Sequence, residues 1–304
     1  MAPDPTPARP SRQRPRRPAR SDRARMLLSC PDRPGIVAAV SQFLFAHGAN
    51  IIRSDQHTTD PAGGTFFMRV EFDLEGFAAR RETLSQAFSP VAAHLEMDWR
   101  LSGSEPVRRV AIFASREGHC LLELLWRWQA GELPCHITMV VANHDELRPV
   151  AEAWGVPFHL IPVRAGAKHE AEKAQLQLLG GGQTDLIVLA RYMQILSPEF
   201  VTRYHGRIIN IHHSFLPAFV GPQPYHQAFE RGVKIIGATA HYVTAELDGG
   251  PIIEQDVQRV THRDNPDDMR RGGRQIERAV LARAVRWHLE DRILLHGGRT
   301  VVFD

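Results

Sequence analysis

The chain has few cysteines and no long apolar run. Its 3 cysteines, Cys30, Cys120 and Cys135, are odd in number and include no CxxC pair. This pattern argues against a disulfide framework and favours a reducing cytoplasm. No apolar stretch approaches the roughly 18 residues that a membrane-spanning helix needs. The sequence also has no GxGxxG or Walker motif, so it gives no indication of a nucleotide cofactor.

The net positive charge of the chain comes from its first residues. The formal net charge is +3, yet residues 1–25 hold eight Arg and two Asp, a net +6, which leaves −3 for residues 26–304. Residues 1–25 are rich in Pro and Arg and have no apolar face, which predicts a disordered tail. A nucleic-acid-binding arm and an organelle transit peptide are the alternatives, but the segment has no aromatic residue and many prolines. We expect neither a nucleic acid nor a membrane as partner.

Two domains follow the tail. Residues 26–102 predict a ferredoxin-like βαββαβ unit, with strands over 25–30, 51–58, 65–73 and 97–101 and helices beginning at 36 and over 77–95. Residues 48–50 are expected to cap the first helix, and apolar and polar residues are expected to alternate along 65–73. Residues 103–107 are the expected linker.

Residues 108–304 alternate between strand and helix patterns, which is typical of a doubly wound, mostly parallel α/β sheet. The expected strands cover 110–114, 136–141, 158–161, 186–189 and 207–211, and the expected helices cover 121–130, 146–154 and 168–179. Antiparallel strands at 235–243 and 252–260, a helix at 273–289 and a last strand at 300–303 complete the prediction.

Three polar residues stand out near the end of the strand at 207–211. Asn210 and His212 are two residues apart, so both point to the same side of the strand. Asp248 follows His212 by 36 residues, in a Gly-rich turn. An amide donor, an imidazole and a carboxylate are the parts of an acyl-transfer site that needs no covalent nucleophile. Open parallel sheets bind ligands near their strand ends.

The segments around these residues resemble the folate-dependent formyltransferases, which act on 10-formyltetrahydrofolate. The similarity comprises Asn-Ile-His at 210–212 with Ser-Phe-Leu-Pro at 214–217, then Asp-Gly-Gly-Pro-Ile-Ile at 248–253, and the segments 189–197 and 239–243. The blocks occur in the family's order over about 200 residues. The resemblance implies a Rossmann-like catalytic domain without a metal or cofactor. A zinc site is the rival reading of the many histidines, but they form no HxxxH or HExxH motif.

Two features narrow the resemblance to the formyltetrahydrofolate deformylases. Residues 28–40 look like the start of an ACT domain. In the related ribonucleotide transformylases, the first turn of the catalytic domain is a Gly-rich phosphate cradle, but here it retains one glycine and carries Glu117. The resemblance implies hydrolysis of 10-formyltetrahydrofolate to tetrahydrofolate and formate, which supplies formate for purine synthesis and balances the folate pool. The alternatives are a transformylase with a phosphate-free amine acceptor and an amino-acid-sensing ACT regulator.

The resemblance also implies roles for single residues. Asn210 would donate to the formyl oxygen, His212 would be the general acid/base, and Asp248 would orient His212 and assist proton movement. Three further residues are expected to support this set: His241, His213, which by alternation should face the other way, and Ser214.

The expected folate pocket has two parts. Residues after one strand end would form an apolar slot for the pterin, and a second loop would face it; the candidates are Arg191, Met193, Ile195, Leu196, Val243, Thr244, Glu246 and Leu247. For Ile195 and Leu196 taken singly, ordinary core packing is the competing interpretation. Pro222 stiffens the loop 219–226, but we expect Gly221 to leave enough flexibility for activity.

ACT domains commonly pair and bind small ligands at the shared interface. Gly35 and Asn50 match the positions that usually frame an amino acid, although a helix start and a helix C-cap explain them equally well. We expect a homo-oligomer, with glycine or methionine as the candidate effector.

Overall fold

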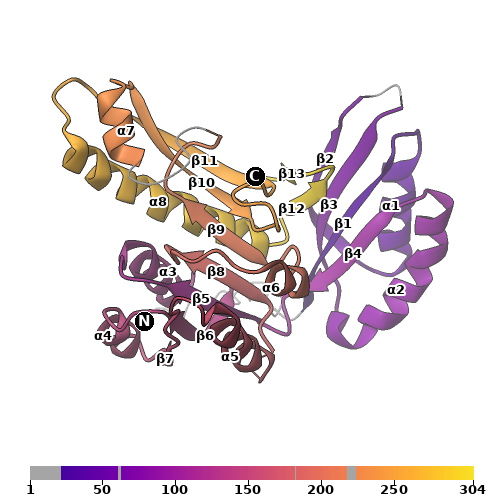
Figure 1. The fold of residues 1–304 in the computed structure, drawn as a ribbon. Helices are drawn as coiled ribbons and strands as arrows, with labels where there is room; N and C mark the ends of the chain where they lie inside the picture. Colours follow the sequence, from indigo (N-terminus) through magenta and orange to yellow (C-terminus); the bar gives the residue numbers. More distant parts are fainter. Residues whose placement is uncertain (1–21, 61–62, 182, 218–223) are drawn as a thin grey trace, which may run out of the picture.

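The computed structural model describes residues 22–60, 63–181, 183–217 and 224–304. Most of the basic tail, as well as Gly221 and Pro222, lies outside these residues. The described chain forms two domains side by side, which are joined by a short linker (Figure 1). Among the described residues, we find no helix with the length and apolar character to cross a bilayer.

The N-terminal domain has the expected βαββαβ order. It comprises β1 (Arg23–Pro31), α1 (Ile36–Ala46), β2 (Asn50–Thr58), β3 (Thr65–Asp73), α2 (Phe77–His94) and β4 (Asp98–Gly103). The strands form an antiparallel sheet in the order β2-β3-β1-β4. Both helices cover one face of this sheet (Figure 1), and their apolar side chains form the domain's core.

Three details of this domain differ from expectation. β1 begins at Arg23, inside the expected tail, because Arg23 pairs with Asp73 on the neighbouring strand (Nε–Oδ1 3.4 Å). The helix α1 ends at Ala46 with His47 as its C-cap, so Asn50 is no cap but the first residue of β2. β3 does not alternate: it is buried on both faces, because a hairpin of the catalytic domain covers the face opposite the helices, where the Phe67 and His296 rings lie 5.0 Å apart.

The C-terminal domain, residues 108–304, is the expected catalytic domain and contains a seven-stranded sheet in the order β11-β10-β9-β8-β5-β6-β7. Its strands are β5 (Arg108–Ala114), β6 (Cys135–Ala142), β7 (Phe158–Leu160), β8 (Leu186–Ala190), β9 (Ile208–His212), β10 (Ile235–Tyr242) and β11 (Ile252–Arg259). β5 to β9 are parallel, and β10 and β11 are antiparallel additions. The doubly wound prediction is therefore confirmed.

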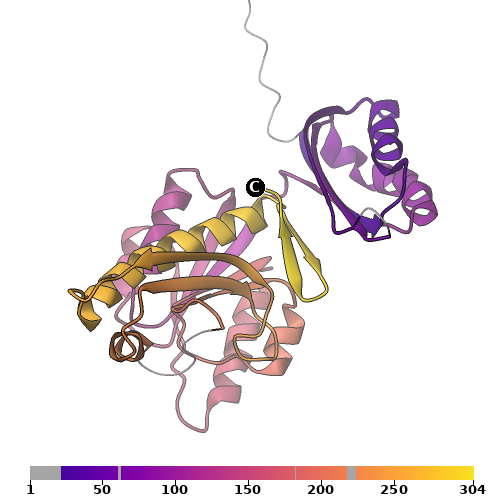
Figure 2. The same cartoon turned by 90° about the horizontal axis from the view of Figure 1, so that it is seen from above.

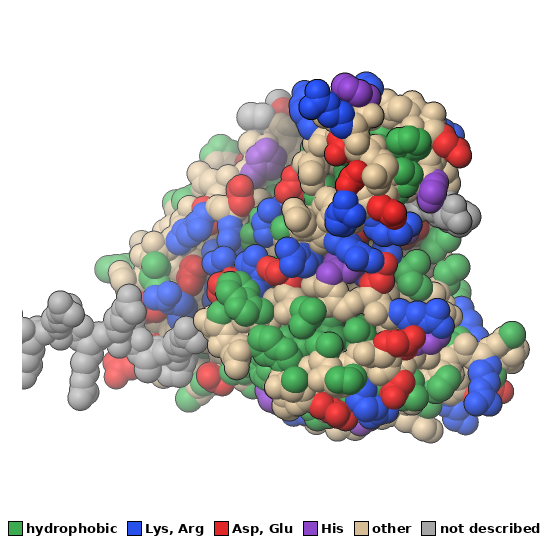
Figure 3. All heavy atoms as spheres, turned by 90° about the vertical axis from the view of Figure 1, so that its left-hand side faces the viewer, with side chains coloured by type: hydrophobic (Ala, Val, Ile, Leu, Met, Phe, Trp, Pro, Cys, Tyr) green, Lys and Arg blue, Asp and Glu red, His purple; other side chains and the backbone are tan. Residues whose placement is uncertain are grey.

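Helices cover both faces of this sheet. They are α3 (His119–Gln129), α4 (Arg148–Ala153), α5 (Lys168–Gly181), α6 (Pro198–Arg203), α7 (Pro224–Glu230) and α8 (Pro266–Leu289). One apolar core lies between the sheet and α3 and α8, and a second lies between the sheet and α5 and α6. On the face shown in Figure 3, basic and acidic side chains are mixed in a band across the middle, next to an apolar area.

The helix α8 begins seven residues before the expected position. Asn265 caps it by accepting hydrogen bonds from the backbone N–H groups of Asp267 and Asp268, and the Asp268 side chain accepts from the Asn265 N–H in return. The residues of this capping box, Asn265 and Asp268, stand three apart in the sequence and indicate a helix start there, earlier than the apolar pattern does. Also unpredicted were α6, α7 and β12 (Ile293–His296), which pairs with β13 (Arg299–Val302) in the hairpin that reaches the N-terminal domain (Figure 2).

Candidate active site

The candidate catalytic residues lie on one face of the sheet, where β9 and β10 pair. The register sets His241 directly opposite Asn210, and Thr239 opposite His212. Side chains directly opposite each other in an antiparallel pair lie on the same face. The Asn210 amide nitrogen is accordingly 3.2 Å from His241 Nε2. The sequence had marked His241 as a supporting residue, and the structure places it against Asn210.

Asp248 completes this group from the hairpin loop between β10 and β11. Its carboxylate lies 3.3 Å from His212 Nδ1 and 3.6 Å from His241 Nε2. The loop leaves β10 beside Ile208, the first residue of β9, where the Val243 N–H donates to the Ile208 carbonyl. The loop must therefore fold back over the sheet face to bring Asp248 to His212. The site lies on this face and not only at the expected strand ends.

The backbone conformation of this loop restricts which residues can occupy two of its positions. Asp248 has a φ of +53°, a left-handed conformation that Asp and Asn tolerate better than most residues. A Cβ on Gly250 would lie 1.7 Å from the Tyr242 carbonyl oxygen, so only glycine allows the loop to approach β10 this closely. The contacts with His212 and His241 hold the pKa of Asp248 well below its usual range. Asp248 is therefore a carboxylate at neutral pH.

The hydrogen bonds within the site determine which of its polar atoms can still bind a substrate. His241 Nδ1 is 2.9 Å from the Tyr242 carbonyl, which can only accept, so this nitrogen carries a proton. His241 Nε2 lies between the Asn210 amide nitrogen at 3.2 Å and the Asp248 carboxylate at 3.6 Å. Asp248 likewise requires a proton on His212 Nδ1. One N–H of Asn210 then remains, together with His212 Nε2, which is buried and has no hydrogen-bond partner among the described residues.

The residues that follow β9 are only partly as expected. His213 was predicted to face away from His212, but β9 ends at His212, so strand alternation does not extend to it. The rings of the two histidines lie 5.1 Å apart. Burial and then the positive charge of Arg191 lower the pKa of His213 to about 4, so it is neutral at pH 7. The Ser214 carbonyl accepts a hydrogen bond from the Thr239 hydroxyl (2.9 Å), which braces this segment against β10.

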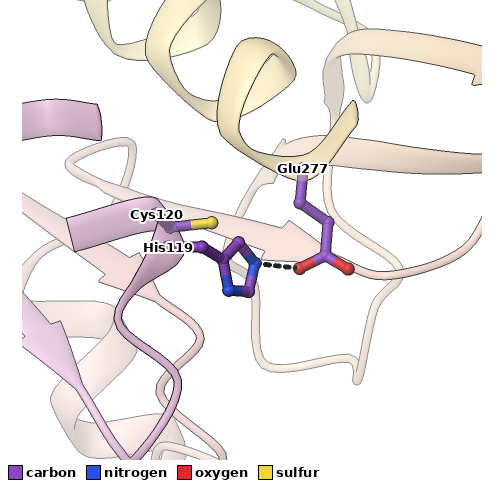
Figure 4. Close-up of side chains that lie close together, drawn as sticks. All are labelled: His119, Cys120 and Glu277. Carbon is purple, nitrogen blue, oxygen red and sulfur yellow. Dashed lines mark hydrogen bonds and ion pairs between the residues drawn. The ribbon is translucent and has the colours of Figure 1, made fainter. Parts of the chain in front are cut away.

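A second polar cluster adjoins these histidines. Glu277, from the middle of α8, points toward His119 at the start of α3 (Figure 4), with Nε2 and Oε2 2.8 Å apart. The Tyr225 hydroxyl donates to the other oxygen of Glu277 at 3.0 Å. Burial alone would raise the pKa of Glu277, but His119, Arg191 and Tyr225 together lower it. The sequence did not predict this cluster, because its members are far apart in the chain. The one local indication is Glu277 itself, an acidic residue on the otherwise apolar face of α8.

His119, Cys120 and Glu277 offer potential metal ligands within 4.8 Å of one another. Their chemistry does not suit a cation. Burial raises the pKa of the Cys120 thiol well above its usual value, so it stays protonated. Arg191 Nε already lies 3.5 Å from the Glu277 oxygen that a metal would need. The cluster is better described as a hydrogen-bond network.

The first turn of the catalytic domain carries a fixed negative charge. Arg191 contacts Glu117 at 3.1 Å, and Arg274 contacts it at 3.3 Å. Burial would raise the pKa of Glu117, but the two guanidinium groups lower it, so it remains a carboxylate. The side chain of Arg191, an expected folate contact, is therefore engaged within the protein.

The other expected folate residues occupy two loops. After β8, the side chains of Met193 and Ile195 are 58% and 60% exposed, whereas Leu196 is buried in the core with α6. Leu196 thus follows the competing interpretation of a packing residue. In the loop after β10, Leu247 is 60% exposed and Glu246 is also exposed. Val243 and Thr244 are partly buried at its start.

The expected effector residues do not meet within one chain. Gly35 has a φ of +96° at the start of α1, and Asn50 is exposed just beyond the end of that helix. Since α1 has 11 residues, its length of roughly 16 Å separates them.

The chain matches known proteins in both domains. Residues 25–89 match the ACT domain family, and residues 108–285 match the formyl transferase family. A formyltetrahydrofolate deformylase of Bacillus subtilis is 56% identical, over 93% of this chain and 94% of the relative. The crystal structure of a formyltetrahydrofolate deformylase from Pseudomonas syringae superimposes with a TM-score of 0.87 at 50% identity, over 93% of this chain and 95% of that one.

A more distant similarity covers only about two thirds of the chain. Glycinamide ribonucleotide transformylase 1 from Symbiobacterium toebii has a TM-score of 0.63 at 31% identity, and it covers 67% of this chain and 97% of its own length. The similarity to the two deformylases, in contrast, covers 93% of this chain.

Proposed function

The chain belongs to the formyltetrahydrofolate deformylase family, and on this basis we propose how its residues hydrolyse the formyl group. The enzyme converts 10-formyltetrahydrofolate and water to tetrahydrofolate and formate. One observation supports the mechanism above all: Asp248 binds His212 Nδ1 and leaves His212 Nε2 buried and available.

Water attacks the formyl carbon with His212 as general base. As the new C–O bond forms, a water proton moves to His212 Nε2. The ring becomes an imidazolium, which the carboxylate of Asp248 stabilises from the opposite nitrogen. Because the pKa of Asp248 is well below its usual range, this carboxylate orients and stabilises His212 without taking the proton itself.

The tetrahedral intermediate carries its negative charge on the former formyl oxygen. The remaining N–H of Asn210 and the protonated Nε2 of His212 both donate to this oxygen. Removing one such donor typically costs about 10²–10³-fold in kcat. Collapse breaks the bond between the formyl carbon and N10, His212 returns its proton to N10, and the product formic acid ionises to formate.

Water is the proposed acceptor because the first turn does not suit a phosphorylated amine. The carboxylate of Glu117, held by Arg191 and Arg274, occupies the turn that serves as a phosphate cradle in transformylases. A phosphate there would face this fixed negative charge. Folate would lie against the exposed Met193 and Ile195 and the loop containing Leu247. We propose no resident metal or cofactor.

The ACT domain suggests an amino-acid ligand, and we propose glycine or methionine. Since Gly35 and Asn50 lie at opposite ends of α1, one small ligand could contact both only if two copies of the domain supply them. We therefore propose a homo-oligomer whose turnover responds to one of these amino acids. Asn50→Ala should abolish the response without changing the basal rate. If neither amino acid alters the rate or the assembly, the domain serves assembly alone. The three free, buried cysteines support a cytoplasmic location.

The decisive experiment measures formate release from 10-formyltetrahydrofolate by the purified protein, with no amine present. Release at a steady rate, unchanged when a phosphorylated amine is added, supports hydrolysis. Formate production that requires an amine, or a formylated amine as product, would establish a transformylase. His212→Asn and His213→Asn form a matched pair, and only the first should lose most turnover.

A further inference from the structure

Arg191 has an unusual backbone conformation at the point where the chain leaves the sheet. It follows Ala190, the last residue of β8, and its φ of +62° lies in the left-handed region. This conformation costs free energy in a residue that has a Cβ, and apart from glycine only Asn and Asp adopt it with any frequency. Such a backbone persists only where the surrounding structure holds it.

The guanidinium group of Arg191 is held by two carboxylates from different segments. Its Nε and Nη2 both lie 3.1 Å from one oxygen of Glu117, in the turn between β5 and α3. Nε also lies 3.5 Å from Glu277, on α8. The side chain is 12% exposed, and Nη1, which has no hydrogen-bond partner among the described residues, is itself buried. The guanidinium is therefore enclosed by protein groups.

The charges of this clamp persist at neutral pH. Glu117 and Glu277 both remain carboxylates, because the pKa of each is lowered by the cations around it. Burial would lower the pKa of Arg191, but Glu277 and Glu117 raise it. Glu277 is moreover 1% exposed and cannot move freely. The clamp is thus a fixed support for the end of β8.

The two residues after Arg191 are fixed elsewhere. Tyr192 is 5% exposed in the core beside α5 and α6, where its hydroxyl accepts a hydrogen bond from Gln175 at 2.9 Å. The Met193 N–H donates to the Ser115 hydroxyl at 3.0 Å. Arg191 and Tyr192 are therefore anchored on opposite faces of the sheet. The left-handed residue between β8 and this anchor sets the direction in which the next segment leaves the sheet.

That segment presents two apolar side chains to the solvent. Met193 is 58% exposed and Ile195 is 60% exposed, whereas Leu196 is buried. At the far end of the segment, the Ser197 N–H donates to the Glu172 carboxylate at 2.8 Å. Exposed apolar side chains on a short loop that is held at both ends form a ready surface for a flat ring.

We propose that Arg191 is a positioning residue for the folate substrate. Its guanidinium, clamped by Glu117 and Glu277, keeps the left-handed backbone that places Met193 and Ile195 against the pterin. The Arg191 side chain makes no contact with the substrate. This role rests on the proposed function, since the ligand of the loop is the folate of the deformylation reaction.

The test compares KM and kcat for formate release. Arg191→Ala removes the clamp but keeps a Cβ, so binding would have to restore the left-handed backbone, and KM should rise by about tenfold. At saturating substrate, kcat should stay within about threefold of the wild type, because the ion pair between His212 and Asp248 does not involve Arg191.

Arg191→Gly separates the backbone from the side chain. Glycine adopts the left-handed region without this cost, so KM should be about fivefold or more below that of Arg191→Ala. Glu117→Gln should raise KM as well. The double variant Glu117→Gln/Arg191→Ala should be no worse than Arg191→Ala alone, because Glu117 acts through Arg191.

Arg127→Ala is the matched control. Arg127 also joins two carboxylates, those of Glu123 and Glu132, but at the C-terminal end of α3. Its KM should equal that of the wild type. The thermal midpoint of each variant shows whether it is folded, and if Arg191→Ala is not, Glu117→Gln decides.

Three results would overturn the proposal. A KM of Arg191→Ala, or of Glu117→Gln in its place, within about twofold of the wild type would show that the loop needs no clamp. Equal KM values for Arg191→Gly and Arg191→Ala would show that the guanidinium binds the substrate directly. A wild-type protein that releases no formate would refute the proposed function, and this proposal with it.

Discussion

Replacing Asp248 by Asn tests the proposed mechanism most directly. The change keeps the size of the side chain and removes its charge. It should not strain the backbone, because Asn tolerates the φ of +53° at this position at least as well as Asp. The thermal midpoint should therefore stay close to that of the wild type, and any loss of rate will reflect chemistry.

The expected loss follows from the distance between Asp248 and His212. A carboxylate 3.3 Å from a protonated imidazole stabilises it by about 5 kcal/mol at an effective dielectric constant of about 20. The contact is partly exposed, so about 3–5 kcal/mol is a fair range. This free energy corresponds to a decrease in kcat of roughly 10²–10⁴-fold.

The assay compares kcat and KM for formate release, with Asp264→Asn as the control. Asp264 is a partly exposed residue in the loop before α8 and accepts from Thr261, so its variant has the same change in charge outside the β9–β10 site. KM should change little for Asp248→Asn, since Asp248 contacts protein groups in the site. A kcat within about fivefold of the wild type would remove Asp248 from the mechanism.

Three further predictions concern the site and its surroundings. Asn210→Asp should lower kcat by about 10²–10³-fold, because a carboxylate cannot donate to the oxyanion; formate release with unchanged rate would refute this role. Gly250→Ala should impair activity and lower the thermal midpoint, because its Cβ would meet the Tyr242 carbonyl at 1.7 Å. Gly249→Ala should be tolerated, because the atoms nearest to its Cβ belong to the exposed Glu246 side chain, which can move; similar losses in both variants would contradict this reasoning. The free energy of unfolding should fall as the pH decreases below about 6.5, because burial lowers the pKa of His213 to about 4 and that of His288 to about 3. The unfolded chain then binds protons that the native chain does not, at up to about 1.4 kcal/mol per pH unit for each residue; denaturant titrations at pH 7, 6 and 5 that give equal free energies would exclude the effect.

The amino-acid sequence by itself determined much of the fold. Strands and helices follow from the periodicity of neighbouring residues, so the βαββαβ order of the N-terminal domain and the main strands and helices of the second domain were predicted, with most boundaries within two residues, whereas α6, α7 and β12 were not. The errors have local causes: the capping box at Asn265 was overlooked, and the short β12 lacked a long apolar pattern. Asn210 and His212 could be placed on one face from alternation alone, because this property belongs to a single strand.

Only the tertiary structure decided which distant groups meet. His241 lies against Asn210 because of the β9–β10 register, and Asp248 reaches His212 because a glycine lets its loop fold over the sheet. The Glu277 network likewise combines residues that no local pattern connects. Local periodicity depends on adjacent residues. The register between strands, the path of a loop over the sheet and the contacts between distant elements depend on how whole elements pack, so they could not be predicted from the sequence.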